Sequence, residues 1–511
     1  MKMNSLSALT EYLVPFTAKK IDTQLLWNNP LDSDVLAELK TEASYLIEDN
    51  KRHSCFDPHS QLLADEKLFY AERYGGGAIS HNGGGARCGF DGRWQVKGIG
   101  ANALVGIGSK QVDGELTFTG AVLEALWGNL MAKLLPYGAV SNKAILLADN
   151  VSICNAPLTS STIHGRRALL VREPVVRPAH FCRAPYYQPH AAMLSQPTDT
   201  IRVEKLIAAV PSLLPRPLML DEEQWLALTQ EERAFYGLCE LAQRLATQIA
   251  FCRSRHLVMM TSPSNCDMQG RLLDFHGMRN VFPGDRQDAG RSYIQHNKLN
   301  QDAPLLLRGV QDLGFYLAKY QFGTEFLSAT RQSISDSFNN AYIQTRLLEN
   351  LEMAGFDKTF LQGLILTNEW VVFGERLQNI FDLSAGIFTQ RQGLGQGNTH
   401  PAIILLHQLI DTGASGVAAK NATTAGEQFS QTFHRLCEQY LHESRSQGIT
   451  VADRQKTMKD TITRRLSPRA FMTRETIYQE IASWHGEINE VREQLQAYQI
   501  SFEHQAISIL Q

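Results

Sequence analysis

The chain has 511 residues, of which 43% are hydrophobic and 20% are charged, so it has enough apolar material for a large folded core. Its 49 Lys and Arg residues nearly balance 52 Asp and Glu residues, and a net charge of −3 excludes the strongly basic footprint of a nonspecific nucleic-acid binder. No run reaches the roughly 18 apolar residues of a membrane span. The N-terminal residues lack the apolar centre of a secretory signal. These features favour a cytoplasmic enzyme or enzyme-like protein.

The predicted elements, taken in chain order, divide the sequence into four segments. Apolar positions at helical intervals predict a helical extension over residues 1–69. Residues 70–180 form a predicted nucleotide-binding lobe that contains strands and, near its start, many of the chain's 37 glycines. We expect a helical lobe with a metal-binding loop over 181–395 and a C-terminal helical extension over 396–511. The sequence therefore predicts an α+β fold.

Eight cysteines are scattered along the chain, and none lies in a CxxC pair. This spacing offers no zinc-binding pattern, and a long chain without a secretory signal keeps its thiols reduced. We interpret the cysteines mainly as core residues, with a redox or metal site as the alternative.

The glycine-rich lobe contains a candidate pair of charged residues. Lys97 ends a predicted strand over 93–96, and Glu124 lies within a predicted helix over 118–135. A strand Lys paired with a Glu of the next helix holds nucleotide phosphates in kinase-like folds, because the cation binds phosphate and the anion orients it. The alternative is an exposed Lys and a solvated helix Glu. Two further strands are predicted over 144–152 and 167–174.

A second candidate site lies in the loop over 261–277, after a long amphipathic pattern that begins near residue 221. Asn265 and Asp274 are nine residues apart, and Asp274 follows two leucines and precedes Phe-His-Gly. Amide and carboxylate oxygens are hard ligands suited to a Mg²⁺ ion that bridges phosphates. The alternative is a β-turn between two short strands, since Ser, Pro, Asn and Asp all favour turns.

A dinucleotide-binding interpretation of the same lobe can be rejected. The run from Gly98 through Gly100 to Ala103 fits GxGxxA after a strand. However, the residues that follow are glycine-rich and make a poor phosphate-binding helix. No second strand ending in Asp or Glu appears at the required distance.

Taken together, these segments resemble the SelO/YdiU family of kinase-fold proteins, which transfer AMP from ATP to protein side chains. The resemblance extends from Tyr74 to about Leu317. The run DGELTFTGAVLEAL is similar to the family's DGRAVLRSSIREFL, which places the family's helix Glu on Glu124. The run SPSNCDMQGRLLDFHGMR is similar to NTDNMSILGLTIDYGPFG, and DRQDAGRSYIQHNK keeps Gly290 and Arg291 of a third motif, with Tyr293 slightly out of register.

The resemblance implies a two-lobed, protein-kinase-like fold that binds ATP and Mg²⁺ and transfers AMP to a protein or peptide. It implies that Asn265 and Asp274 bind the metal. The first arginine of a family CRxAPSxxRxG motif falls on Arg183 in CRAPYYQPH. The cofactor-binding residues implied or selected by motif are Lys97, Gly98, Gly100, Glu124 and Arg183.

Several family positions have changed in this chain. The position of the family's catalytic base is Ser264, and the nearest carboxylate, Asp267, lies on the other side of Asn265. A general base must reach the proton that it removes, so the sequence identifies no catalytic residue. The family's second arginine is also lost, and Arg172 or Arg177 are the available substitutes.

Two functions therefore stay open. The first is a SelO-like nucleotidyltransferase that uses ATP and Mg²⁺ to transfer AMP, or alternatively phosphate. The second is an altered pseudokinase that serves as the ATP-binding partner subunit of another enzyme, for example in the maturation of a bacterial, microcin-like peptide. Apolar residues at heptad spacing predict a helix over 477–502, which either packs on the chain's own helices or offers a seam to a partner subunit or a second copy.

Overall fold

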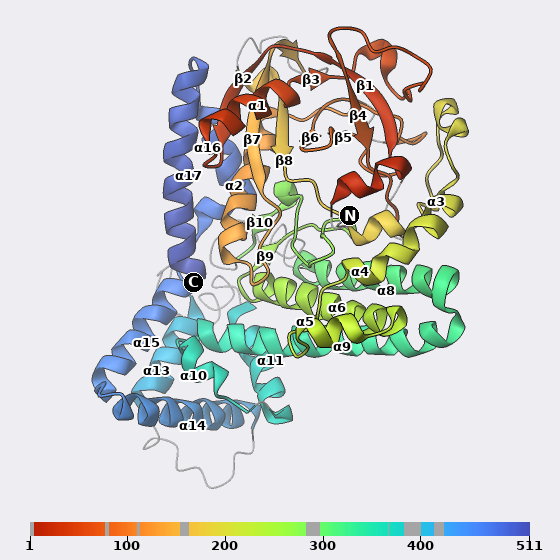
Figure 1. The fold of residues 1–511 in the computed structure, drawn as a ribbon. Coiled ribbons are helices and arrows are strands. Elements are labelled where there is room, and N and C mark those ends of the chain that lie inside the picture. Colours follow the sequence, from red (N-terminus) through yellow and green to blue (C-terminus); the bar gives the residue numbers. More distant parts are fainter. Residues whose placement is uncertain are drawn as a thin grey trace.

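The chain folds into a mixed α+β structure in which one antiparallel sheet lies over a mainly helical part, as the sequence predicts (Figure 1). The long helix α17 (Ile488–Leu510) runs beside the sheet, at the left in the view of Figure 1. Among the described residues, no helix combines the length and apolar character needed to cross a membrane. This computed structural model describes residues 5–76, 81–109, 113–153, 163–282, 297–365, 367–382, 400–412 and 424–511.

The sheet has eight strands in the order β2-β7-β8-β6-β5-β4-β1-β3, and every neighbouring pair is antiparallel. The strands predicted near 93–97, 144–152 and 167–174 are confirmed as β6, β7 and β8. The strand bounds are β1 (Val14–Lys20), β2 (Thr23–Asn28), β3 (Tyr45–Leu46), β4 (Glu66–Ala71), β5 (Cys88–Phe90), β6 (Gln95–Lys97), β7 (Asn142–Ser152) and β8 (Arg166–Arg172).

The prediction of a helical extension over residues 1–69 is wrong for much of its length. The helix α1 (Ser33–Ala43) is present, but β1 and β2 flank it on the N-terminal side and both belong to the large sheet. Along β1, Val14, Phe16 and Ala18 are buried while the residues between them are less so. This alternation has the period of a strand rather than of a helix. The N-terminal segment is therefore part of the sheet.

The helix α2 (Phe118–Leu134) packs on β7 and β8, close to its predicted bounds of 118–135. Thr117 caps its first turn by accepting a hydrogen bond from the backbone N–H of Gly120. Its residues are buried on nearly every side, because the sheet covers one face and α17 covers another. Such a helix holds its side chains in fixed positions.

In the helical part, α6 (Gln230–Ser254) packs along α9 (Thr324–Met353) and α8 (Asp302–Leu317) beneath the sheet. A short ladder of β9 (Leu257–Val258) and β10 (Arg279–Asn280) brackets the loop that carries Asn265 and Asp274. The remaining helices are α3 (Asp199–Leu206), α4 (Val210–Leu213), α5 (Glu222–Ala227), α6 (Gln230–Ser254), α8 (Asp302–Leu317), α9 (Thr324–Met353), α10 (Lys358–Gln362), α11 (Asn368–Asp382), α13 (Pro401–Thr412), α14 (Ala425–Ser446), α15 (Val451–Arg465) and α16 (Arg474–Ser483).

Two large apolar cores hold these helices together. The first joins α2 to α6, α8, α16 and α17, and so connects the sheet to the helices below it. The second contains Phe282 and residues from Leu347 in α9 to Leu466 after α15. It therefore includes residues well before residue 396, where the C-terminal extension was predicted to start.

The predicted continuous helix over 477–502 is wrong, because α16 and α17 are separate helices. Gly486 lies between them at φ +109°, a backbone conformation that ends a helix. The apolar residues of the heptad pattern pack against the chain's own core. There the rings of Trp127 in α2 and Phe502 in α17 meet edge to face, with centroids 5.4 Å apart. This face is therefore not available as a seam for a partner subunit or dimer.

Four residues named from the sequence lie outside the described residues: Cys154 and the motif residues Gly290, Arg291 and Tyr293. Most of the described cysteines are free, buried thiols, in line with their interpretation as core residues: Cys88, Cys182, Cys252, Cys266 and Cys437.

Candidate functional site

Lys97, Glu124 and Asp274 come together between the sheet, α2 and the loop over 261–277. The ammonium group of Lys97 lies 2.6 Å from Oε2 of Glu124 and forms a second ion pair with the carboxylate of Asp274. Lys97 and Glu124 are 2% and 1% exposed, which excludes the alternative of a surface Lys and a solvated helix Glu. The sequence predicted the pair of Lys97 with Glu124 and, separately, Asp274, and the fold joins all three into one charged cluster.

Arg172 belongs to the same cluster, although the sequence singled it out only as a substitute for a lost arginine. It ends β8, the strand that neighbours β6, and its Nη1 lies 3.2 Å from Oε1 of Glu124 and 3.9 Å from Oδ1 of Asp274. Burial opposes its charge, but Cys88, Glu124 and Asp274 raise the pKa of Arg172. Two cations thus face two carboxylates, and the cluster is close to neutral.

A short antiparallel turn places Asn265 and Asp274 next to each other. The backbone N–H of Leu273 donates to the carbonyl of Asn265 at 3.1 Å, and Cys266 pairs with Leu272 in a β-bridge. The turn interpretation of this segment is therefore correct, and it is also what places the two candidate metal ligands together.

Asp274 has an unusual backbone conformation and a strongly perturbed carboxyl group. Its φ of +71° lies in the left-handed region, which is uncommon outside glycine and clusters at functional sites. Burial would raise its pKa, but Lys97, the hydrogen bond with His276 and Arg172 together hold the pKa of Asp274 well below its ordinary value. Ligand atoms of Glu124, Asp274 and His276 all lie within 4.8 Å of one another, so they could share a cation.

Buried polar contacts fix the backbone of the loop over 261–277. The carboxylate of Asp302, at the start of α8, accepts hydrogen bonds from the backbone N–H groups of Met259 and Thr261, each at 2.9 Å. On the other side, Nη1 of Arg177 donates to the carbonyl oxygen of Ser264 at 3.2 Å. These two contacts hold the loop between the helical part and the segment that follows the sheet.

Neither Ser264 nor Asp267 provides a free base. The hydroxyl of Ser264 lies 2.8 Å from that of Ser262 and 3.4 Å from Oδ1 of Asn265. The carboxylate of Asp267 accepts from the backbone of Gln269 and Arg271 and pairs with the guanidinium of Arg271 at 2.7 Å. Burial raises the pKa of Asp267 in spite of these contacts. Its role is to hold the turn, and no catalytic residue emerges at this position.

A second buried polar group, which was not predicted from the sequence, adjoins the first. Glu72, just after β4, accepts a hydrogen bond from Nε2 of His180 at 3.1 Å. The backbone N–H of Arg177 donates to Nδ1 of His180, which fixes the proton on Nε2. Burial opposes the charge of Glu72, but Arg177 and His180 lower its pKa. The guanidinium of Arg177 lies 5.2 Å from the ring centre of Tyr74, so the charged residue is also held by an aromatic face.

Gly98 follows Lys97, and Gly100 lies two residues further on. The space beside both glycines is filled by other parts of the protein. Both have positive φ, +96° and +123°. A Cβ on Gly98 would lie 2.5 Å from the carbonyl oxygen of Ala168, and one on Gly100 would lie 2.9 Å from Cβ of Ile47. Glycine is therefore required at both positions by the fold itself.

Arg183 is separate from the Lys97 cluster. Its carbonyl accepts a hydrogen bond from Gly76 at 2.9 Å, and its charge acts on the hydroxyl of Tyr316 in α8. Within the described ranges, no hydrogen bond or ion pair joins Arg183 to Lys97, Glu124 or Asp274.

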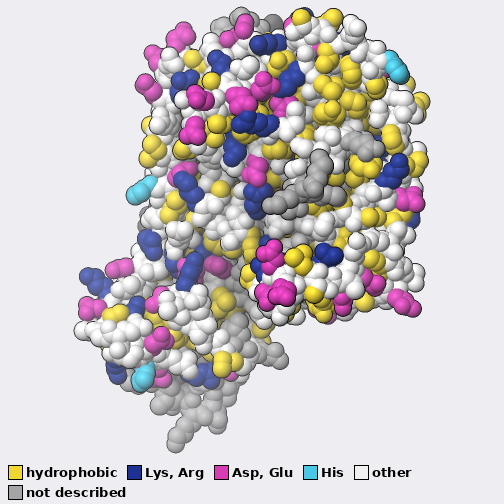
Figure 2. Space-filling view, viewed as in Figure 1, with side chains coloured by type: hydrophobic (Ala, Val, Ile, Leu, Met, Phe, Trp, Pro, Cys, Tyr) yellow, Lys and Arg dark blue, Asp and Glu magenta, His cyan; other side chains and the backbone are white. Residues whose placement is uncertain are grey.

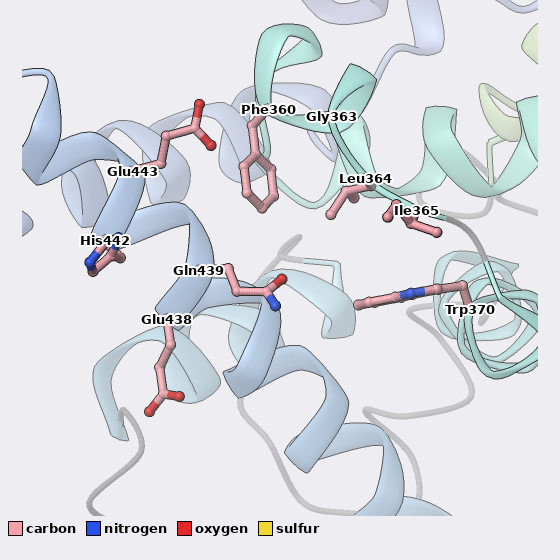
Figure 3. Close-up of a pocket in the computed structure, with 9 residues that line it drawn as sticks. All are labelled: Phe360, Gly363, Leu364, Ile365, Trp370, Glu438, Gln439, His442 and Glu443. Atoms are coloured by element: carbon pink, nitrogen blue, oxygen red, sulfur yellow. The ribbon is translucent and has the colours of Figure 1, made fainter.

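The viewed surface carries charges of both signs, and one cavity lies away from the Lys97 cluster. Figure 2 shows Lys and Arg interspersed with Asp and Glu on the viewed face, in keeping with the net charge of −3. A cavity of 730 Å³ lies between α10, α11 and α14, where Phe360, Trp370 and Gln439 face one another (Figure 3). The cavity belongs to the second core and not to the Lys97 cluster.

No known family model matches the sequence, and no curated protein shows significant similarity to the sequence.

Proposed function

We propose that this chain is a two-lobed, protein-kinase-like nucleotidyltransferase of the SelO type that uses ATP and Mg²⁺ to transfer AMP to a protein or peptide acceptor. The observation that carries the proposal is the buried ion pair of Lys97 with Glu124, made in the same place as the contact of Lys97 with Asp274. In kinase folds a strand Lys, a helix Glu and a metal-binding Asp form this set, and both the ion pair and the metal contact must be in place for phosphoryl chemistry.

The chemistry of the side chains fits the two ligands. Asn265 offers an amide oxygen and Asp274 a carboxylate, which are the hard oxygen ligands that Mg²⁺ prefers. When bound, the ion neutralises phosphate charge and ATP supplies the AMP group. Lys97 would bind phosphate oxygens and Glu124 would orient Lys97. Arg172, whose Nη1 lies 3.2 Å from Oε1 of Glu124, would hold Glu124 in place. Arg183 would act on phosphate only if ATP extended toward Tyr316.

The experiment uses the full-length chain with Mg²⁺ and ATP labelled on either the α- or the γ-phosphate. Protein-bound α-label that is lost in Asp274→Ala supports AMP transfer. Label from the γ-phosphate alone would identify a kinase and contradict the proposal. The matched control is Asp411→Ala, which removes an exposed carboxylate that pairs with Lys459 on the helical surface and should leave labelling unchanged.

A second function is favoured by the contacts of Ser264 and Asp267. Asp267 is bound to Arg271 and Ser264 has no acidic side chain, so neither residue beside Asn265 in the described part of the chain offers a free base for the acceptor. Under this alternative the chain binds ATP as the partner subunit of another enzyme, such as one that matures a peptide. Saturable ATP binding without transfer of either label, together with a stable hetero-complex, would favour it over the first proposal. Loss of all ATP binding would contradict both.

A further inference from the structure

A cavity of 560 Å³ opens between the loop after Arg183 and the helices α8 and α9. Its floor is apolar and fully buried at Ile334, which is 1% exposed, while Tyr186 and Phe315 on its walls are 62% and 43% exposed. Its volume lies in the range of sites that accept one or a few side chains. Exposed aromatic side chains around a buried floor are typical of the anchoring pockets of protein interfaces.

The charge around this cavity is predominantly positive. Arg308 and Arg331 line it, and the charge of Arg183 reaches its wall at Tyr316. Among the described residues that line it, the one acidic side chain is Asp312, which is already bound to Arg308 at 2.9 Å. Arg331 has no acidic partner within the part of the chain that the structure describes. A carboxylate on an incoming segment would find an unpaired guanidinium there.

The cavity lies beside the loop that carries Ser264 and Asn265. Gly309 of α8 packs so closely against this loop that a Cβ would lie 3.1 Å from Cβ of Pro263. Arg308, the residue before Gly309, lines the cavity. A peptide held in the cavity therefore needs only a short extension to reach the loop.

We propose that this cavity docks an acidic segment of the acceptor, with an aromatic or large aliphatic side chain between Tyr186 and Phe315 and a carboxylate paired with Arg331. The inference rests on the proposed function and names its substrate class. A phosphate ligand is less suited to the site, because the lining residues of α8 lie inside that helix and Leu327, in the first turn of α9, already donates its backbone N–H to the carbonyl of Gly323. The side chains that line the cavity suit a carboxylate next to an apolar group.

The test measures fluorescence anisotropy of labelled peptides with the full-length chain. The probe peptide has the sequence Gly-Glu-Tyr-Glu-Gly-Ser-Gly, and matched peptides carry Lys in place of both Glu residues or Ala in place of Tyr. The variants are Arg331→Glu and Phe315→Ala, both on exposed parts of the walls. The control, Arg445→Glu, makes the same charge reversal on the exposed surface of α14. Thermal unfolding verifies that each variant is folded.

The acidic peptide should bind the wild-type chain, and Arg331→Glu and Phe315→Ala should each weaken binding by about tenfold, as expected for an anchoring residue. Arg445→Glu should not change it, and both matched peptides should bind more weakly. Equal binding of the acidic and the Lys peptides would overturn the proposal, as would full displacement of the peptide by excess inorganic phosphate. Folded Arg331→Glu and Phe315→Ala variants that bind as tightly as the wild type would also overturn it.

The same assay separates this proposal from the proposed function. Asp274→Ala should bind the acidic peptide normally, because Asp274 does not line the cavity. Peptide binding without ATP binding would contradict the nucleotidyltransferase and leave the docking site in place. Transfer of α-label by a chain that does not bind the acidic peptide would contradict the docking site alone.

Discussion

Arg172 contacts Glu124 on the carboxylate oxygen that Lys97 leaves free. Its Nη1 lies 3.2 Å from Oε1, whereas Lys97 lies 2.6 Å from Oε2. Since Glu124 is almost fully buried, an unpaired charge there would be strongly unfavourable. Two cations from neighbouring strands therefore each pair with one oxygen of this carboxylate, so one cation remains beside it when the other is replaced.

This arrangement predicts strongly non-additive stability changes. Lys97→Met should lower the free energy of unfolding by about 2 kcal/mol, less than the usual 3–5 kcal/mol for breaking a buried pair, because Arg172 remains. The double variant Lys97→Met with Arg172→Met should lose more than the sum of the single variants. The control Lys133→Met removes the ion pair between the half-exposed Lys133 of α2 and Glu503 of α17 and should change stability by at most about 1 kcal/mol. Urea unfolding measures all four, and simple additivity would contradict the shared role.

Asp267 is expected to stabilise the turn and not to take part in transfer. Asp267→Asn keeps the shape but loses the charge that binds Arg271. It should lower the free energy of unfolding by about 1–3 kcal/mol, the usual range for a weakened buried contact with a charged group. The rate of α-label transfer per folded molecule should stay within about twofold, whereas loss of a general base removes about 10²–10⁴-fold. A loss of that size would make Asp267 the base.

Replacing Ser264 by an acid should restore a base beside Asn265. The hydroxyl of Ser264 already lies 3.4 Å from Oδ1 of Asn265, so a carboxylate at this position would lie near the candidate metal ligand. Ser264→Asp should raise the rate of α-label transfer by about 10²-fold or more, in line with general-base catalysis. Ser264→Asn is the matched control without a charge. Equal rates for the Asp and Asn variants would show that no base is missing here.

Two glycines of similar backbone conformation allow the role of Gly98 to be isolated. Gly92 and Gly98 have φ values of +103° and +96°, but a Cβ on Gly92 would meet nothing within 4 Å. Gly92→Ala should therefore lower stability by about 1–2 kcal/mol through backbone strain alone. Gly98→Ala adds a clash with the carbonyl of Ala168 and should lose a further 1–3 kcal/mol or so. Equal losses in urea unfolding would mean that Gly98 is not constrained by its neighbours.

His256 predicts a specific dependence of stability on pH. Burial lowers its pKa to about 3, while its hydrogen bond to Asp382 acts in the opposite direction. Because the unfolded chain binds a proton below about pH 6.5 and the folded chain does not, stability should fall as the pH drops below 6.5. The single histidine contributes a loss of about 2 kcal/mol between pH 7 and pH 5. His256→Asn tolerates the φ of +57° and should remove this part of the slope. An unchanged slope would contradict the assignment.

The sequence predicts best the elements whose signals are local. The strand that ends on Lys97 and the helix that carries Glu124 are confirmed nearly to the residue, since alternation and an apolar helical run closed by Pro136 are readable in short windows. The spacing of Asn265 and Asp274 places both on one turn. Their roles in binding metal and nucleotide stay predictions, because no feature of the fold alone assigns a ligand.

The errors arise where distant parts of the chain decide the structure. The strand β1 pairs with β4 some fifty residues later, from Val14 opposite Ala71 to Lys19 opposite Glu66, and a helical pattern nearby obscured its alternation. The contact of Arg172 with Glu124 depends on the register of β8 beside β6, and no short window of the sequence contains both strands. The heptad spacing continues across Gly486, so it concealed the break between α16 and α17.

The contact between α2 and α17 has a consequence for biosynthesis. Lys133 of α2 and its partner Glu503 are 370 residues apart in the chain. At ribosomal rates of about 5–20 residues per second, the face of α2 that carries Trp127 emerges tens of seconds before Phe502 can cover it. During that interval the helix that presents Glu124 lacks its α17 partner, so this apolar surface stays uncovered on the growing chain until the last residues are made.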